Sequence, residues 1–153
     1  MQIDQSISAL VSEIDGFLSD REGNTLHDLA KKGEGWGSIV EIGSWKGKST
    51  IWIAKAISKN VSFYAIDPHI GSSEHQTEGP IWTFEEFKQN IARAGVQDKI
   101  IPLVQTSEDA RRSVDEPLGF LFIDGAHEYE FVKKDFELWS LCWPLLSRPI
   151  FCC

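Results

Sequence analysis

The sequence is poor in cysteine, with three in 153 residues. Cys142, Cys152 and Cys153 are odd in number and lie near the C-terminal end, and they form neither a CxxC pair nor a cysteine–histidine spacing typical of metal ligands. Disulfide frameworks use paired cysteines and belong to oxidising compartments. We therefore expect a cytoplasmic protein in a reducing environment, without a structural zinc site.

Long uncharged segments are also missing. The longest, residues 138–147, has about half the length that a membrane-spanning helix needs. The N-terminal segment carries acidic residues where a secretory signal peptide would carry lysine or arginine. These two absences predict a soluble protein without a membrane span or a secretory leader.

Basic residues are outnumbered by acidic ones. Lys and Arg total 15 and Asp and Glu total 23, which gives a formal net charge of −8 at pH 7. A negative field of this kind repels phosphate backbones and anionic membrane surfaces. We therefore expect no nucleic acid and no membrane as partners.

The residues that are present indicate one globular domain. A chain of 153 residues, 42% hydrophobic and 25% charged, is long enough to bury a single core and short for two, so one domain over residues 1–153 is expected. Apolar residues at helical spacing over residues 3–18 predict an opening amphipathic helix, and a shorter helix is expected at about 25–33. Residues 1–34 would form an N-terminal helical segment that precedes the α/β core.

After this N-terminal helical segment, predicted strands alternate with predicted helices. Apolar runs predict strands at 38–42, 61–66, 99–104, 119–123 and 149–153, and helices are expected at 49–59, 83–95, from 107 and at 129–139. Such alternation specifies an α/β fold, a doubly wound and mainly parallel Rossmann-like sheet with helices on both faces. Because proline cannot donate to a sheet ladder, Pro102 places the third strand at an edge, which the order 3-2-1-4-5 satisfies.

Two local predictions concern the chain after the second strand. Residues 69–80 form an irregular polar stretch and a lid candidate, in which His69 and His75 are expected to be solvated. Thr83 and Glu86 have the spacing of a capping box, so we expect them to begin the following helix.

Residues of the types found in ligand-binding sites follow three of the predicted strands. Open α/β sheets bind ligands outside the carboxyl ends of their strands, where the winding direction reverses, here between the first and fourth strands. A glycine turn at residues 43–47 follows the first strand, Asp67 follows the second and Asp124 follows the fourth. The sequence therefore predicts one crevice lined by a tight turn and two carboxylates.

Two phosphate-binding patterns compete for the glycine turn. The string GSWKGKST resembles a Walker A loop, but three residues separate Gly43 from Gly47 where that motif has four. The dinucleotide fingerprint GxGxxG requires a glycine where Trp45 stands. A P-loop-like nucleotide-phosphate binder, with FLFID at residues 120–124 as its second motif, is kept as an alternative.

A third pattern fits without a missing residue. The string EIGSWKGKST, residues 41–50, resembles the ExGxxxGxST first motif of class I S-adenosylmethionine-dependent methyltransferases. The string IDGAHEYEFVKKDFELW, residues 123–139, is similar to the IDGxHxYxxVxxD signature of the branch that includes macrocin O-methyltransferases. Together the two resemblances extend over about residues 39–139.

This resemblance implies S-adenosylmethionine as the cofactor and a role for each matching residue. The implied cofactor-binding residues are Glu41, Gly43, Ser44, Gly47, Asp67, Thr106, Ser107 and Asp124. By the same resemblance, Glu41, Gly43 and Gly47 would contact the methionine end. Asp67 would hold the ribose hydroxyls, and Thr106 and Ser107 would line the adenine.

The resemblance also implies the catalytic residues. In that branch the Asp of IDGxH is a divalent-metal ligand and the His is a candidate general base, which are Asp124 and His127 here. Mg²⁺ prefers carboxylate oxygens and lowers the pKa of a bound hydroxyl, and imidazole accepts a proton near neutral pH. We therefore expect O-methylation of a small-molecule acceptor, with Mg²⁺ assistance through Asp124.

Each of these positions also has a purely structural interpretation. Gly43 and Gly47 would serve as turn residues, and Asp67 would end its strand in a turn. Asp124 would cap the next helix. Glu41 would accept N–H bonds from the turn and fix its shape, which is compatible with a role in binding.

The C-terminal part of the sequence departs from the family. Class I methyltransferases usually have seven strands, whereas four or five are predicted here, and no carboxylate follows Glu137 to complete a cation site. The chain is therefore expected to be shortened or diverged there, with an open sheet edge that favours a homodimer. The alternative to an active enzyme is a vestigial or regulatory module that binds S-adenosylmethionine without transferring its methyl group.

Overall fold

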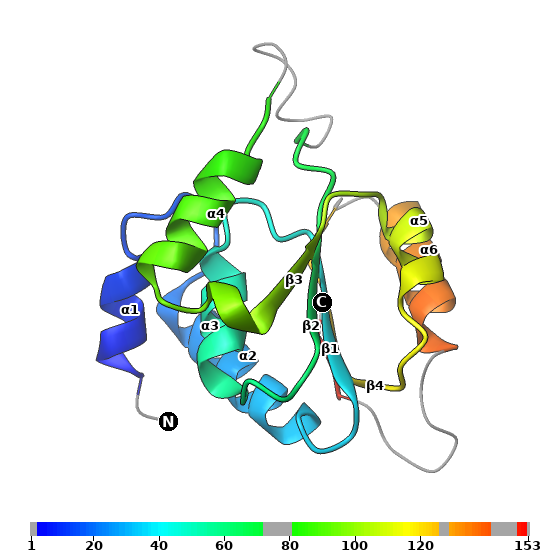
Figure 1. Ribbon diagram of the computed structural model, residues 1–153, viewed down its shortest axis with the longest axis horizontal. Coiled ribbons are helices and arrows are strands. Elements are labelled where there is room, and N and C mark those ends of the chain that lie inside the picture. Colours follow the sequence, from blue (N-terminus) through cyan, green and yellow to red (C-terminus); the bar gives the residue numbers. More distant parts are fainter. Residues whose placement is uncertain (1–2, 72–80, 126–128, 142–149, 153) are drawn as a thin grey trace.

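The computed structural model is an α/β fold built on one parallel sheet (Figure 1). It describes residues 3–71, 81–125, 129–141 and 150–152. The strands are β1 (Ser38–Ile42), β2 (Phe63–Ile66), β3 (Ile100–Leu103), β4 (Leu118–Ile123) and β5 (Ile150–Cys152). Their order is β3-β2-β1-β4-β5 and every neighbouring pair is parallel, so the predicted doubly wound order is confirmed. Pro102 lies in the edge strand β3, as its missing N–H predicts.

Helices cover both faces of the sheet (Figure 1). One face carries α1 (Gln5–Val11), α2 (Asp20–Gly33), α3 (Lys48–Ala56) and α4 (Phe84–Arg93), and the other carries α5 (Ser107–Ala110) and α6 (Tyr129–Ser140). Two short 3-10 helices, η2 (Gln97–Lys99) and η3 (Arg111–Ser113), precede β3 and β4.

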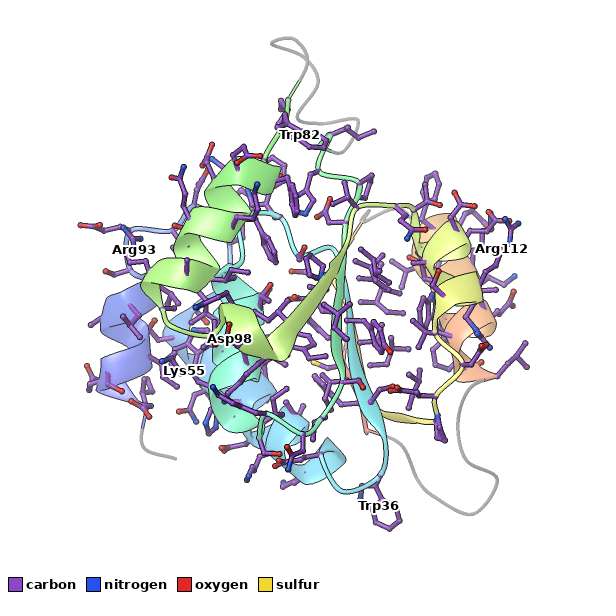
Figure 2. All side chains as sticks on the ribbon, in the orientation of Figure 1. Trp36, Lys55, Trp82, Arg93, Asp98 and Arg112 are labelled. Carbon is purple, nitrogen blue, oxygen red and sulfur yellow. The ribbon has the colours of Figure 1, made fainter. Side chains whose placement is uncertain are left out.

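The two faces of the sheet have separate cores, because successive residues of a strand point to opposite faces. Ile39 of β1 packs in the core under α1–α4, which also contains Trp52, whereas Val40 packs in the core under α5 and α6 together with Trp139. Figure 2 shows side chains filling the space between the sheet and the helices on both sides, with Trp36 and Arg112 at the outer surface.

The N-terminal helix is shorter than its apolar spacing predicts. α1 ends at Val11, and Gly16 adopts a φ of 140°, which takes the chain out of helical geometry. Ile14 is buried, but Phe17, predicted on the same apolar face, is 99% exposed. α2 begins at Asp20, five residues before the predicted start, because Ser19 and Glu22 form a capping box.

The predicted capping box at the start of α4 is wrong, and so is the predicted solvation of His69. Thr83 makes no side-chain cap bond, and its Oγ1 instead pairs with Nδ1 of His69 at 2.9 Å. Glu86 pairs with Lys46 at 3.0 Å. His69 is only 1% exposed and its ring lies against those of Phe84 and Phe87, so tertiary packing overrides the local pattern. His75 lies outside the described residues.

A membrane span was searched for in the described part of the chain. No helix there has the length and apolar character needed to cross a bilayer.

Candidate functional site

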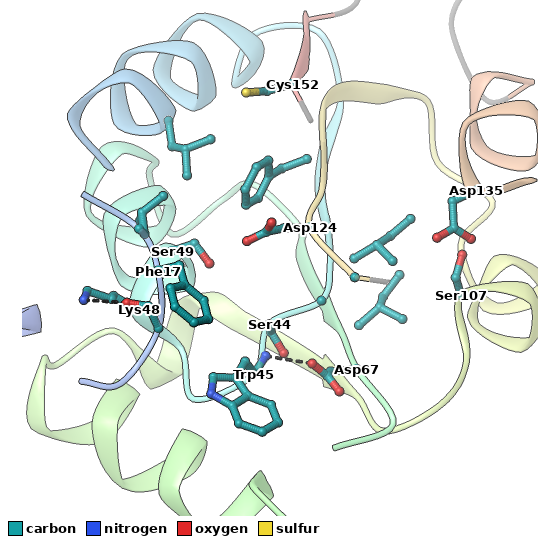
Figure 3. A pocket seen from close by; sticks show the side chains of 18 of the residues that line it. Phe17, Ser44, Trp45, Lys48, Ser49, Asp67, Ser107, Asp124, Asp135 and Cys152 are labelled. Atoms are coloured by element: carbon teal, nitrogen blue, oxygen red, sulfur yellow. Dashed lines mark hydrogen bonds between the residues drawn. The ribbon is translucent and has the colours of Figure 1, made fainter. Parts of the chain in front are cut away.

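A cavity of about 1070 Å³ lies at the carboxyl ends of the central strands (Figure 3). Its wall includes Ile42 and Gly43 from the end of β1, Ile66 and Asp67 from the end of β2, and Asp124 from the end of β4. This is the position at which the sheet reverses its winding, so the sequence placed the crevice correctly.

The turn after β1 is fixed by contacts within the protein. Gly43 has a φ of 91° and donates its N–H to the Ile66 carbonyl at 2.8 Å. A Cβ on Gly43 would lie 2.4 Å from the carbonyl oxygen of Asp124, so only glycine fits where the turn meets the end of β4. Gly47 has a φ of 89°, and a Cβ there would meet Phe87 rather than the cavity. The close approach of backbone at these glycines is therefore to other parts of the chain.

Asp67 links the turn after β1 to the loop after β2. Its Oδ2 accepts the backbone N–H of Trp45 at 2.7 Å, and its Oδ1 accepts that of His69 at 2.6 Å. Asp67 is 9% exposed and lines the cavity, and each oxygen keeps a further lone pair. Trp45 and His69 both have positive φ, 45° and 58°, a strained backbone conformation that their bonds to Asp67 stabilise.

Glu41 lies behind the cavity wall. Its carboxyl is fully buried and accepts the hydroxyls of Ser49 and Thr50, each at 2.5 Å. Burial, with a smaller contribution from the nearby charges of Asp124 and Asp67, raises the pKa of Glu41 to about 8, although the bonds from Ser49 and Thr50 act in the opposite direction. Its partners are hydroxyls of α3 and not the turn N–H groups expected from the structural interpretation, and Ser49 rather than Glu41 lines the cavity.

Ser44 carries a buried hydroxyl that has no hydrogen-bond partner among the described residues. The residue is 1% exposed and lines the cavity (Figure 3). Buried hydroxyls in proteins nearly always have a partner. Ser44 therefore places at the cavity wall a covered hydroxyl whose partner is not among the described residues.

Asp124 is exposed at the end of β4 and lines the cavity, and its backbone N–H donates to the Ile42 carbonyl at 2.8 Å. His127, the predicted base, lies outside the described residues. Within residues 3–71, 81–125, 129–141 and 150–152, no three His, Cys, Asp or Glu side chains gather as a metal site. The described side chains therefore do not form a cation site around Asp124.

The opposite end of the cavity is formed by α5 and α6. Thr106 is exposed and caps α5, accepting the N–H of Asp109 at 3.2 Å. Ser107 Oγ accepts the indole N–H of Trp139 at 2.9 Å, and both Ser107 and Asp135 line the cavity. Burial raises the pKa of Asp135, and the nearby Ser107 hydroxyl opposes this shift.

Sequence reasoning missed two parts of the cavity wall. The first is Asp135, the last residue of the IDGxHxYxxVxxD string, which lines the cavity. It lies four residues before Trp139, and this spacing puts both side chains on one face of a helix. That spacing was the sequence feature that could have indicated its position. Residues 15–18 also line the cavity, held by the Lys48 ammonium, which donates to the Gly16 carbonyl at 3.1 Å (Figure 3). In the sequence, Gly16 was the one residue that indicated an end to the N-terminal helix before this segment.

A family model described as a methyltransferase domain matches residues 40–148. The chain belongs to this family. The matched region includes the glycine turn, Asp67 and the whole wall formed by α5 and α6.

Solved structures share the fold of this methyltransferase domain. The O-methyltransferase TomG from Streptomyces achromogenes, which is involved in tomaymycin synthesis and was solved with S-adenosylmethionine, is 22% identical with a TM-score of 0.69. An O-methyltransferase from Bacillus cereus, solved with S-adenosylhomocysteine, is 21% identical with a TM-score of 0.68. The alignments cover 94% of this chain in both cases but only 62% and 64% of those proteins. The chain thus spans less than two thirds of their length.

Proposed function

We propose that this methyltransferase domain binds S-adenosylmethionine and transfers its methyl group to an oxygen of a small molecule. The observation that carries the proposal is the carboxylate of Asp67, held by two backbone N–H groups at the wall of a large cavity where the sheet reverses. A carboxylate in this position accepts hydrogen bonds from two neighbouring hydroxyls, which is the chemistry of a ribose.

The other residues at this end suit the rest of the cofactor. The unpartnered hydroxyl of Ser44 would bond a polar group of the ligand. Asp67 and Asp124 contribute negative charge to the cavity wall. A negative wall favours a cation, and the sulfonium of S-adenosylmethionine is one. When bound, the cofactor supplies an electrophilic methyl group, and the task of the protein is to position the acceptor oxygen in line with it.

A phosphate-binding turn is not supported by the hydrogen bonds. The N–H of Trp45 donates to Asp67 and the N–H of Gly47 donates to the Ser44 carbonyl at 2.8 Å, so two amides of the turn are used inside the protein. A phosphate loop needs such amides directed at its ligand. The carboxylates nearby would also repel a triphosphate.

Several finer assignments belong to the same proposal. We propose Asp124 and His127 as the catalytic pair, membership of the macrocin O-methyltransferase-like branch, a cytoplasmic location and a homodimer through the open sheet edge. We derive no catalytic step through Mg²⁺, because the described side chains do not form a cation site.

Calorimetry with the whole chain tests the proposal. S-adenosylhomocysteine, ATP with Mg²⁺, and NAD⁺ are titrated in turn, and we expect only the first to bind. Asp67→Asn should weaken its binding about tenfold or more, because a charged acceptor is lost. Asp98→Asn is the matched control, since Asp98 is exposed, lies on η2 before β3 and does not line the cavity (Figure 2). Tight ATP binding without a response to S-adenosylhomocysteine would refute the proposal.

Transfer is tested separately, with cofactor labelled in its methyl group and a panel of hydroxylated small molecules. Label recovered as a methyl ether supports an O-methyltransferase. Nucleoside binding without transfer to any acceptor supports the vestigial module instead.

A further inference from the structure

Besides the parts formed by the turn after β1 and by α5 and α6, the cavity has a third wall, between α2 and the ends of β4 and β5. Its residues are Arg21 and Leu26 of α2, Phe122 of β4, Cys152 of β5, and Phe17 from the segment before α2. We call this wall the α2 side. We propose that it binds the acceptor, a hydroxylated carboxylic acid whose carboxylate pairs with Arg21. This inference rests on the proposed function, because it names the class of molecule that receives the methyl group.

The α2 side lies on the other face of the sheet from α5 and α6, because α2 covers that face (Figure 1). Asp124 follows Phe122 by two positions, the spacing that puts successive side chains of an extended chain on one face. In Figure 3 the carboxylate of Asp124 points toward Ser49 and away from Ser107. A molecule lying on Phe122 therefore extends toward Asp124, one of the two residues proposed as catalytic.

Arg21 is the cation of the cavity wall that the fold does not use. Among the described residues, the basic side chains that line the cavity are Arg21, Lys48 and Lys134. Lys48 donates to the Gly16 carbonyl at 3.1 Å, and Lys134 pairs with Glu108 at 2.6 Å. The guanidinium of Arg21 makes no hydrogen bond or ion pair with any residue that the structure describes. Its fork of N–H donors is therefore available to a ligand.

The two acidic neighbours of Arg21 in the sequence are bound elsewhere. Asp20 accepts the Ser8 hydroxyl at 2.5 Å, and Glu22 accepts the backbone N–H of Ser19 at 2.8 Å. Arg21 also lies in the first turn of α2, where the helix dipole disfavours a positive charge. None of these local interactions accounts for a cation at this position, whereas an anion bound at the cavity wall would stabilise it.

The rest of the α2 side is mainly apolar. Leu26 and Phe122 line the cavity and are buried in the core under α1–α4. Phe17 is 99% exposed although it also lines the cavity (Figure 3). An aromatic ring left in water at a cavity wall gains stability when the apolar body of a ligand covers it. The α2 side therefore suits a molecule with an apolar body and one anionic group.

A carboxylate fits this wall better than a phosphate does. The guanidinium of an arginine binds either group through two parallel N–H bonds. The single charge of Arg21 balances that of a carboxylate, whereas a phosphate monoester carries close to two negative charges. Asp67 and Asp124 also line the cavity and would repel the second charge.

The test uses pairs of molecules that differ in this one charge: hydroxylated benzoic, phenylacetic and aliphatic acids, each with its primary amide. Calorimetry on the chain saturated with S-adenosylhomocysteine should give a preference of about tenfold or more for the acid in at least one pair. Arg21→Gln should reduce that preference about tenfold, and Arg21→Lys should keep part of it, because lysine retains the charge without the paired N–H groups. Lys32→Gln removes the same charge from an exposed position of α2 outside the cavity and should keep the wild-type preference.

Thermal unfolding separates this role from a structural one. Because Arg21 is exposed and has no described partner, Arg21→Gln should unfold within about 2 °C of the wild type. An unfolding temperature lowered by more than about 5 °C, together with an unchanged preference for the acid, would assign Arg21 to the fold and overturn the inference.

The remaining outcomes point to different failures. If S-adenosylhomocysteine binds but acid and amide bind equally in every pair, or neither binds, the role of Arg21 is overturned and the proposed cofactor stays intact. Stronger binding of a phosphonate analogue than of the matching carboxylic acid overturns the choice of a carboxylate. No binding of S-adenosylhomocysteine overturns the proposed function, and this inference with it.

Discussion

The two ends of the cavity are built in different ways. The first, which we call the turn end, consists of residues 43–47 with Glu41 and Asp67, and its two carboxyl groups are buried and bonded to backbone N–H groups or to buried hydroxyls. The second, the helix end, consists of Ser107, Asp135 and Trp139, and its carboxylate is only partly buried. The difference indicates that the carboxyl groups of the turn end contribute more to the stability of the fold than the partly buried carboxyl of the helix end does.

Gly43→Ala should have the largest effect, because it breaks the turn end at its closest contact. The new Cβ would lie 2.4 Å from the Asp124 carbonyl oxygen, on a residue with a φ of 91°. We expect a loss of about 3 to 5 kcal/mol in the free energy of unfolding, from backbone strain and overpacking together. Chemical denaturation measures it.

Gly95→Ala separates these two causes. Gly95 also has a positive φ, 67°, but a Cβ there would meet nothing within 4 Å. Only the strain should appear, about 1 to 2 kcal/mol. Equal losses in the two variants would mean that the contact between the turn and the end of β4 contributes nothing.

Glu41→Ala should come next in size. It would leave the hydroxyls of Ser49 and Thr50 without their buried acceptor, at a cost of about 2 to 3 kcal/mol. Glu137→Ala, an exposed position at the other side of the molecule, should stay within about 0.5 kcal/mol of the wild type. Both values come from urea denaturation at one pH.

The pH dependence gives an independent measurement of Glu41. Its pKa is raised from 4.5 to about 8, so between these values the folded protein keeps a proton that the unfolded chain releases. Its contribution to stability is complete below about pH 4.5 and decreases as the pH rises to about 8. Glu41→Gln cannot titrate and should lack this decrease. Parallel stability profiles for the two proteins would show that Glu41 does not hold the proton.

The sequence predicted what depends on local pattern. The strand order followed from the alternation of apolar runs with helices and from Pro102, whose missing N–H restricts its strand to an edge. The positions of Asp67 and Asp124 at the cavity followed from the topology, because each directly ends a strand. In all these cases the informative residues lie within or next to the element that they position.

The sequence could not predict what depends on contacts between distant residues. His69 is buried because Thr83 bonds its ring and Phe87 packs on it, and these residues follow it by 14 and 18 positions. Phe17 reaches the cavity wall only because Gly16 turns the chain away from α1. The role of Ser107 was expected from resemblance, but its bond from Trp139 appears only when α5 and α6 are packed together.

Ser44→Ala should have the smallest effect on stability, although Ser44 lies in the turn end. Its buried hydroxyl has no partner among the described residues, so its removal deletes no bond to any of them, and we expect a change within about 0.5 kcal/mol. If the hydroxyl serves the ligand, affinity for S-adenosylhomocysteine should fall about threefold to tenfold. Ser140→Ala, which removes a bond to the Glu137 carbonyl far from the cavity, should leave that affinity unchanged. A stability loss in Ser44→Ala without any change in affinity would mean that the hydroxyl serves the fold. Asp67 would then remain as the ligand-binding group proposed at the turn end.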